Sequence, residues 1–210
     1  MPSVIDICNR ALSHTGTDQT IASLDEKSKE ARLCARWYEH SRDMLLRDMQ
    51  PSFAQRRVAL ANMGEPPAGW EYRYRYPTEC LMLHEVYDPE WYDPRRLEFQ
   101  GRPFDVASSG DGGRVILTNV KAAEARYTAR ITDPNLQPVD FTATLELLLA
   151  ANICMPLLAD PNMAKYLSDR ATLAINQAKT ADMNEAREFD MPEAEWIRDR
   201  FGNTGQGYYG

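Results

Sequence analysis

Very few side chains in this sequence have the types and spacing that catalysis or metal binding requires. The chain of 210 residues contains three histidines, His14, His40 and His84, which lie far apart. Because no H-x-x-x-H or H-E-x-x-H pattern occurs, a zinc or iron site would need ligands from distant segments. No G-x-S-x-G motif surrounds a serine. We therefore expect no metal, no cofactor and no catalytic centre.

Two further patterns could support chemistry but have simpler explanations. Glu85 with Asp88 or Glu90 could form the carboxylate pair that cleaves a glycosidic bond, yet among 31 acidic residues such pairs arise by chance. The run Gly110-Asp111-Gly112-Gly113 lacks the Lys and Ser/Thr of a phosphate-binding loop. It lies between two predicted strands, which indicates a hairpin turn.

The best candidate for nucleic-acid binding is the segment Tyr72-Arg73-Tyr74-Arg75-Tyr76. Bases stack on aromatic rings while arginine contacts phosphate. In a strand, however, alternation places the two residue types on opposite faces. We therefore interpret the tyrosines as packed on the helices and the arginines as facing solvent or a neighbour. The net charge of −7 also argues against a surface that holds phosphates.

The four cysteines, Cys8, Cys34, Cys80 and Cys154, are far apart and form no C-x-x-C pair. All except Cys80 lie on the apolar side of a predicted helix. We expect reduced, buried thiols that act as small hydrophobic side chains.

The elements that position these residues begin with two helices. Residues 4–12 place apolar side chains at a 3-4 spacing after Ser3, which can cap the helix. A second helix is predicted to open at the capping-box pattern Ser23-x-x-Glu26 and to end at Pro51. The buried faces of the predicted helices include four large side chains on which we expect the core to depend: Trp37, Leu45, Leu148 and Leu167.

The middle of the chain has the pattern of β-structure, with three to five short strands expected in residues 70–133. Residues 104–107 and 115–118 should form a hairpin. Residues 124–132 alternate again and should add an adjacent antiparallel strand. Residues 80–87 fit either a helical turn or a strand.

The last third returns to helix. Asp140 is expected to cap a helix that is central, because residues 147–151 are apolar nearly all round. Pro156 should kink or end it, and Asp160-Pro161 should start another helix that runs to about Phe189. A stripe of small side chains on this last helix fits a core-facing surface or a subunit-packing surface equally well: Ala171, Ala174, Ala178 and Ala181.

The C-terminus combines aromatic and glycine residues. An amphipathic stretch with Trp196 and Phe201 precedes residues 202–210, a flexible tail without aliphatic side chains that ends in Tyr208, Tyr209 and Gly210. Because tyrosine and tryptophan are enriched in interfaces, we expect Trp196, Phe201, Tyr208 and Tyr209 to contact a neighbouring subunit or another partner. The alternative for the tail is that it folds back on its own subunit.

No stretch approaches the roughly 18 apolar residues of a membrane helix. The N-terminus lacks the basic start and apolar run of a signal peptide. We expect no membrane contact, with synthesis and assembly in the cytoplasm.

Together these patterns predict an α+β fold that is mainly α. Residues 1–69 and 134–201 should form a helical bundle, and residues 70–133 a small antiparallel β subdomain inserted between its N- and C-terminal helices. Residues 202–210 form the tail.

The first 85 residues also carry a sequence of motifs in a defined order. It reads N-x-A-L…G…I-x-S-L-D-E…Y…R-D-x-L-L…P-x-F-A…L-A…Y-x-Y-P-x-x-C-L, from Asn9 to Leu81. This order resembles the tail tubular protein A family, the head-to-tail adaptors of tailed phages. The sequence departs from the family at Ser52, where an aromatic residue is usual.

The resemblance implies a structural protein of the virion tail or neck, and not an enzyme. It implies a dodecameric ring that docks under the portal protein, receives the tail nozzle, and lets the genomic DNA pass without specific binding. Two alternatives stay open: a helical nucleic-acid-binding accessory protein, and a virion cell-wall hydrolase that uses a carboxylate.

Overall fold

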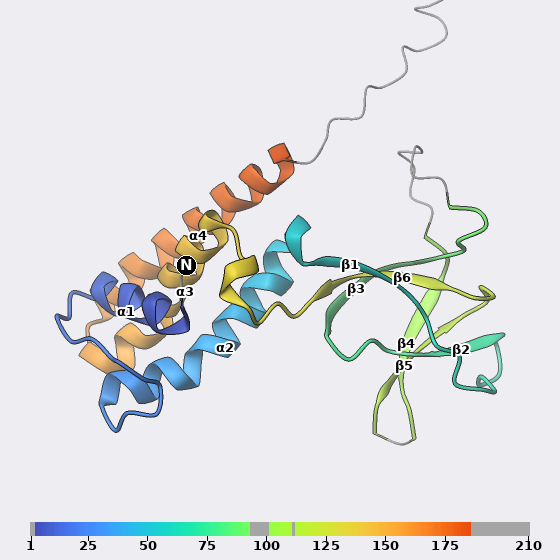
Figure 1. The fold of residues 1–210 in the computed structure, drawn as a ribbon, viewed down its shortest axis with the longest axis horizontal. Helices are drawn as coiled ribbons and strands as arrows, with labels where there is room; N and C mark the ends of the chain where they lie inside the picture. Colours follow the sequence, from blue (N-terminus) through green and yellow to red (C-terminus); the bar gives the residue numbers. More distant parts are fainter. Residues whose placement is uncertain (1–2, 93–100, 111, 186–210) are drawn as a thin grey trace, which may run out of the picture.

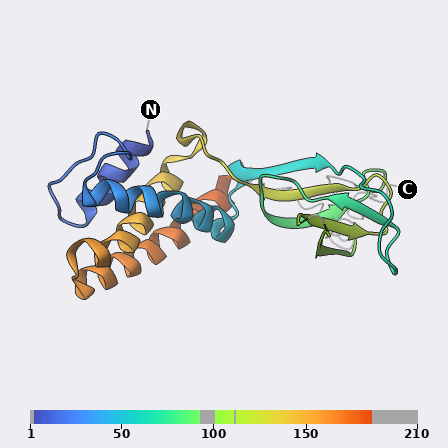
Figure 2. The same ribbon diagram turned by 90° about the horizontal axis from the view of Figure 1, so that it is seen from below.

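The computed structural model describes residues 3–92, 101–110 and 112–185. A bundle of four helices forms one end of an elongated molecule, and two small antiparallel sheets form the other (Figures 1 and 2). The prediction of a mainly α, α+β fold is confirmed.

Helix α1 (Val4–His14) begins as its sequence predicts. The Ser3 hydroxyl accepts a hydrogen bond from the Asp6 amide at 3.1 Å, and the Asp6 carboxylate accepts one from the Ser3 amide at 2.9 Å. This reciprocal pair satisfies two amides that the first turn leaves without partners. The face that α1 buries consists of Ile7, Cys8, Ala11 and Leu12.

Helix α2 (Lys29–Met49) begins later than predicted. Its cap is Ser28, whose hydroxyl accepts from the Ala31 amide at 3.2 Å. The Glu26 carboxylate does accept from the Ser23 amide at 3.0 Å, but this contact closes a turn that precedes the helix. The Ser23 hydroxyl accepts from the Asp25 amide and not from that of Glu26, so only half of the capping box forms, and its assignment to the helix start is wrong. The end is as predicted, with Gln50 in the left-handed conformation before Pro51.

The β part begins at Gln55, well before the expected boundary at residue 70. A short 3-10 turn, η1 (Ser52–Ala54), leads into strand β1 (Gln55–Ala59). One sheet has the order β1-β6-β3, with β6 (Glu124–Ala129) between β1 and β3 (Cys80–Tyr87). The other has the order β2-β5-β4, formed by β2 (Tyr72–Arg75), β5 (Arg114–Thr118) and β4 (Phe104–Ser108). Residues 80–87 are thus a strand.

The hairpin of β4 and β5 is confirmed, but the neighbours predicted for residues 124–132 are wrong. Strand β6 pairs with β1 and β3, and not with β5. The connection from β5 to β6 carries Val120 and Ala123 into a second apolar cluster between the sheets. The chain changes sheets here because this exchange lets the apolar face of each sheet cover that of the other.

A 3-10 turn, η2 (Pro134–Leu136), precedes α3 (Val139–Leu158). The prediction that Asp140 caps α3 is wrong. The helix begins directly after Pro138, and Asp140 lies in its first turn. Its carboxylate there still complements the positive end of the helix dipole. Pro156 lies in the last turn, and the helix ends two residues later.

Helix α4 (Pro161–Glu185) starts as predicted. The Asp160 carboxylate accepts from the amides of Asn162 and Met163 at 2.9 and 3.1 Å. The expected end near Phe189 lies outside the described residues.

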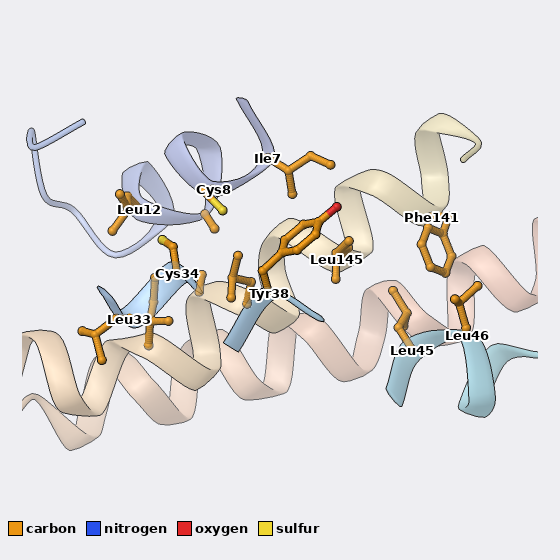
Figure 3. Packing of buried hydrophobic residues seen from close by; sticks show 14 of the residues in the cluster. Ile7, Cys8, Leu12, Leu33, Cys34, Tyr38, Leu45, Leu46, Phe141 and Leu145 are labelled. Carbon is orange, nitrogen blue, oxygen red and sulfur yellow. The ribbon is translucent and has the colours of Figure 1, made fainter. Parts of the chain in front are cut away.

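The main core forms around α3, which packs against α1, α2 and α4. Figure 3 shows side chains of α1 and α2 meeting Leu145 and Phe141 of α3. Leu45 and Leu167 are buried in this cluster, whereas Trp37 and Leu148 are half-buried at its margin. The cluster continues into the β part through Cys80, Tyr127 and Ala129, so the two parts share one core.

Helix α3 contradicts the expectation that no stretch of the sequence approaches the length and apolarity of a membrane helix. Within the described residues it alone has the length and apolarity of a membrane span, with a mean hydropathy of 1.7. Its contacts with three other helices account for an apolar surface on all sides.

We expect Leu45→Ala and Leu167→Ala each to lower the free energy of unfolding by roughly 2–5 kcal/mol, because each removes a fully buried side chain and leaves a cavity. Urea denaturation monitored by circular dichroism measures the change. Leu173→Ala is the control, since Leu173 is 58% exposed on the same helix as Leu167. Equal stabilities for all three variants would contradict the assigned helix faces.

Candidate interaction surfaces

The three histidines lie in separate elements. His14 ends α1, His40 contacts the Trp37 ring edge-on on α2, and His84 of β3 lies 2.7 Å from the Thr128 hydroxyl. Burial lowers the pKa of His84. Among the described residues, no group of three or more His, Cys, Asp or Glu side chains could hold a metal ion. That the protein needs no metal, cofactor or catalytic centre stays a prediction.

Two of the three carboxylates considered for glycosidic cleavage, those of Glu85 and Asp88, have structural partners. Glu85 accepts from the Arg126 guanidinium at 2.7 Å. Asp88 accepts from the Glu90 amide at 3.0 Å within a turn. Each group is therefore already engaged in the β part, and neither contact arranges two carboxylates across a substrate cleft.

All four cysteines are free and buried, which confirms the expectation. Cys8 of α1 and Cys34 of α2 face each other in the main core (Figure 3). The Cys80 thiol donates to the Tyr76 hydroxyl at 3.2 Å. Burial raises the pKa of Cys80 and Cys154, so both thiols stay protonated at neutral pH.

The residues that carry the family resemblance hold the framework together. Asn9 of α1 binds both backbone groups of Ile21: its amide nitrogen donates to the Ile21 carbonyl at 2.9 Å, and its oxygen accepts from the Ile21 amide at 2.8 Å. This clamp fixes the loop that follows α1. It also holds the Ile21 side chain in the main core.

The motif R-D at positions 42 and 43 joins the bundle to the β part. The Arg42 guanidinium, whose side chain is only 4% exposed, donates twice to one oxygen of Asp43, at 3.0 and 2.8 Å. The other oxygen of Asp43 accepts from Arg130 at 2.8 Å, directly after β6. Arg42 also lies over the ring of Tyr38, 5.9 Å from its centroid. Burial raises the pKa of Tyr38 to about 12.

Ser52, where the sequence departs from the family pattern, has a specific partner on α4. Its amide and hydroxyl both donate to the Asp182 carboxylate, at 3.0 and 2.9 Å. A salt bridge of 3.2 Å between Lys179 and Asp48 lies nearby. These contacts attach the C-terminal end of α4 to the end of α2.

The tyrosines of β2 face inward, as predicted, but their neighbours differ from the prediction. Tyr74 is buried between the two sheets, not against the helices, and its hydroxyl donates to the Val120 carbonyl at 2.8 Å. Tyr72 stacks on it at 6.1 Å between ring centroids. Leu60, Ile116 and the other residues of the second cluster surround these rings.

The arginines near β2 face outward along an open groove of about 420 Å³. Arg75, Arg114 and Tyr76 line it, and the Arg114 guanidinium lies 3.9 Å from the centroid of the Tyr76 ring. Arg73 instead donates to the Ser109 hydroxyl at 2.7 Å. This groove is the place where a nucleic acid or an acidic segment would find cations beside an aromatic ring.

The alanines of the predicted subunit-packing stripe differ in burial. Ala171 and Ala178 are buried within the subunit, while Ala174 and Ala181 are half-buried. The other predicted interface residues, Trp196, Phe201, Tyr208 and Tyr209, lie outside the described residues.

Sequence reasoning missed a second, exposed face of the same helix. Tyr166 and Leu173 point away from the bundle and are 55% and 58% exposed. Their spacing of seven residues, which returns to the same side of a helix, was the available signal.

A scan against models of known protein families found no match, and a search of curated proteins found none either.

We expect Asp43→Ala to destabilise the protein by about 3 kcal/mol, because it leaves the buried Arg42 charge without its partner. Arg130→Ala removes the other ion pair of Asp43, but the Arg130 side chain is 47% exposed, so its loss should cost less than about 1 kcal/mol. Urea denaturation of both variants measures the difference. A smaller loss for Asp43→Ala than for Arg130→Ala would show that the buried charge is compensated elsewhere.

Proposed function

We propose that this chain is a structural head-to-tail adaptor of a tailed phage. It forms a dodecameric ring between the portal protein and the tail nozzle, and the genomic DNA passes through the ring without specific binding. The protein acts in the tail or neck of the virion and catalyses no reaction.

The observation that carries this proposal is the ordered motif from Asn9 to Leu81, together with the structural roles of its residues. Asn9 fixes the loop after α1, and Asp43 links α2 to the segment after β6. Phe53 packs edge-on against Phe141, with 5.1 Å between the ring centroids. A motif made of framework contacts supports a shared architecture more than a shared chemistry.

The shape of the molecule supports the same proposal. An adaptor must contact different proteins above and below it, and this subunit has a helical bundle at one end and two sheets at the other (Figure 2). The net charge of −7 is compatible with a ring around DNA, because like charges keep the polymer from adhering.

The main rival is a nucleic-acid-binding accessory protein, which the groove at Arg75 and Arg114 favours. Arg75 and Arg114 are both exposed, and the Arg114 guanidinium also lies over the Tyr76 ring. The hydrolase alternative is weakened because Glu85 is engaged in a salt bridge.

We expect native mass spectrometry to show a complex of the purified protein with the purified portal ring, with the mass of twelve copies bound. The free chain should remain monomeric in dilute solution if the ring contacts need the portal as a template. A single-stranded DNA of matched length, added without portal, is the control ligand. Salt-sensitive binding to that DNA with no portal complex would favour the rival function.

We expect deletion of residues 202–210 to leave the melting temperature nearly unchanged, because this segment has no aliphatic side chain to bury. Incorporation onto portal-bearing capsids should fall, since Tyr208 and Tyr209 are the large interface side chains of the segment. The control replaces Asn203, Thr204 and Gln206 with serine and keeps both tyrosines. Normal incorporation of the deletion variant would refute a docking role.

A further inference from the structure

The groove of about 420 Å³ beside β2 and β5 has a cationic lining. Arg75 and Arg114 belong to this lining and are both exposed, and none of the described lining residues is acidic. Neither arginine forms a salt bridge with another described residue, whereas Arg10, Arg42 and Arg126 each do. We call this surface the Arg75–Arg114 groove.

Other positive charges lie close to the groove. The Arg73 guanidinium donates to the hydroxyl of a lining residue, Ser109, at 2.7 Å. Burial raises the pKa of Tyr76 to about 12, and the positive charges of Arg114 and Arg47 act against that rise. The groove is therefore a positive site on a protein whose net charge is −7.

The chain also contains a segment of complementary charge. Residues 188–195 lie outside the described residues and follow α4, which is described as far as Glu185. They carry four carboxylates and no lysine or arginine: Glu188, Asp190, Glu193 and Glu195. A guanidinium binds a carboxylate through two parallel N–H donors, so this segment matches the chemistry of the groove.

A short acidic segment fits the groove better than a nucleic acid does. Proteins that bind DNA through its phosphates make about 6–10 such contacts along a polymer whose charge is continuous. Here two arginines line the groove, and the polymer would continue over a protein of net negative charge. The acidic run ends at Arg187 on one side and before Arg198 on the other, so its charge is confined to a short length.

The groove and the end of α4 lie on opposite edges of the molecule. Ser109, Gly113 and Arg114, which line the groove, belong to the hairpin of β4 and β5. Figure 1 shows the turn of that hairpin on the lower edge and the last described turn of α4 on the upper edge. A segment that continues from α4 is therefore placed to reach another copy. A contact between unlike surfaces of identical subunits repeats head to tail and closes into a ring when the rotation permits.

We infer that residues 188–195 of one copy bind in the Arg75–Arg114 groove of a second copy. Their carboxylates accept hydrogen bonds from the two guanidiniums. The contact of Arg114 with the Tyr76 ring, at 3.9 Å from its centroid, holds one of these guanidiniums in place. The inference deepens the proposed function, and it rests on that function only in taking the two copies as neighbours in the ring.

Binding of a synthetic peptide to the full-length protein tests the site. The probe is a fluorescein-labelled peptide with the sequence of residues 186–197, and fluorescence anisotropy measures its dissociation constant. In the control peptide, glutamine replaces the three glutamates of the acidic run and asparagine replaces Asp190. We expect the control peptide to bind about tenfold more weakly, because its charges are removed. Equal binding of the two peptides would overturn the inference.

The variant Arg75→Gln/Arg114→Gln should bind the acidic peptide about tenfold more weakly than the parent protein. The matched control is Arg32→Gln/Arg36→Gln, which removes the same charge from two exposed positions of α2. In a charge exchange, Arg75→Glu/Arg114→Glu should bind a peptide whose four acidic residues are replaced by lysine. Equal losses in the two glutamine variants, or no binding in the charge exchange, would contradict a direct contact.

Carboxylates close to the groove provide a further control. Glu65 lines the adjoining cavity together with Arg73, and Asp111 belongs to the turn beside the groove but lies outside the described residues. Glu65→Gln and Asp111→Asn should each change the dissociation constant by less than about threefold. A gain in affinity of about tenfold from either change would show that this carboxylate already pairs with the groove, and the inference would fail.

Carbodiimide crosslinking of the full chain shows which copy supplies the segment. In Arg75→Lys/Arg114→Lys, the carbodiimide takes up the water that is released when a lysine amine and a carboxylate form an amide bond. A concentrated mixture of nitrogen-15-labelled and unlabelled chains is treated, and mass spectrometry identifies the crosslinked peptides. Crosslinks from positions 75 or 114 to residues 188–195 should join labelled to unlabelled chains. Crosslinks confined to one isotopic form would place the segment in its own subunit and refute the contact between copies.

The remaining outcomes separate this contact from other functions. Single-stranded DNA that binds the groove while the peptide does not would assign the groove to nucleic acid and overturn the inference. Peptide binding and crosslinks without a portal complex would keep the contact and refute the adaptor function. A portal complex with peptide binding that is indifferent to Arg75 and Arg114 would keep the adaptor function and refute the contact.

Discussion

The burial of α3 is the constraint on which the rest of the structure depends. Helix α3 is apolar on nearly all sides, and α1, α2 and α4 each cover one part of it. Phe53, just after α2, extends this cover by packing on Phe141. The same core continues to Cys80 and Tyr127 in the β part, where β3 and β6 lie against α2.

Local signals in the sequence predicted the helices well, because capping and apolar spacing act within a few residues. Ser3 and Asp160 are caps, as predicted. The Glu26 carboxylate also accepts from the Ser23 amide, yet this contact closes a turn, since the same hydrogen bond can serve both structures. The pairing of β6 could not be predicted, because it depends on which distant apolar faces cover each other.

The candidate surfaces were predictable only in part. The alternation correctly placed the tyrosines and the arginines of β2 on opposite faces. It could not identify the residues that surround the tyrosines. The alanine stripe of α4 was visible in the sequence, and two of its members are buried within the subunit. The exposed Tyr166 and Leu173 escaped notice because an apolar residue is recognised as unpartnered only when the packing of its helix is known.

An adaptor made of this chain would act through its shape and its surfaces. Its negative net charge would repel the DNA that passes through the ring. Electron cryo-microscopy of the neck of the virion that we propose contains this chain tests that claim most directly. The account predicts a ring of twelve copies between the portal and the tail nozzle, with DNA passing along its axis. A single copy per virion, or no copy at all, would contradict it.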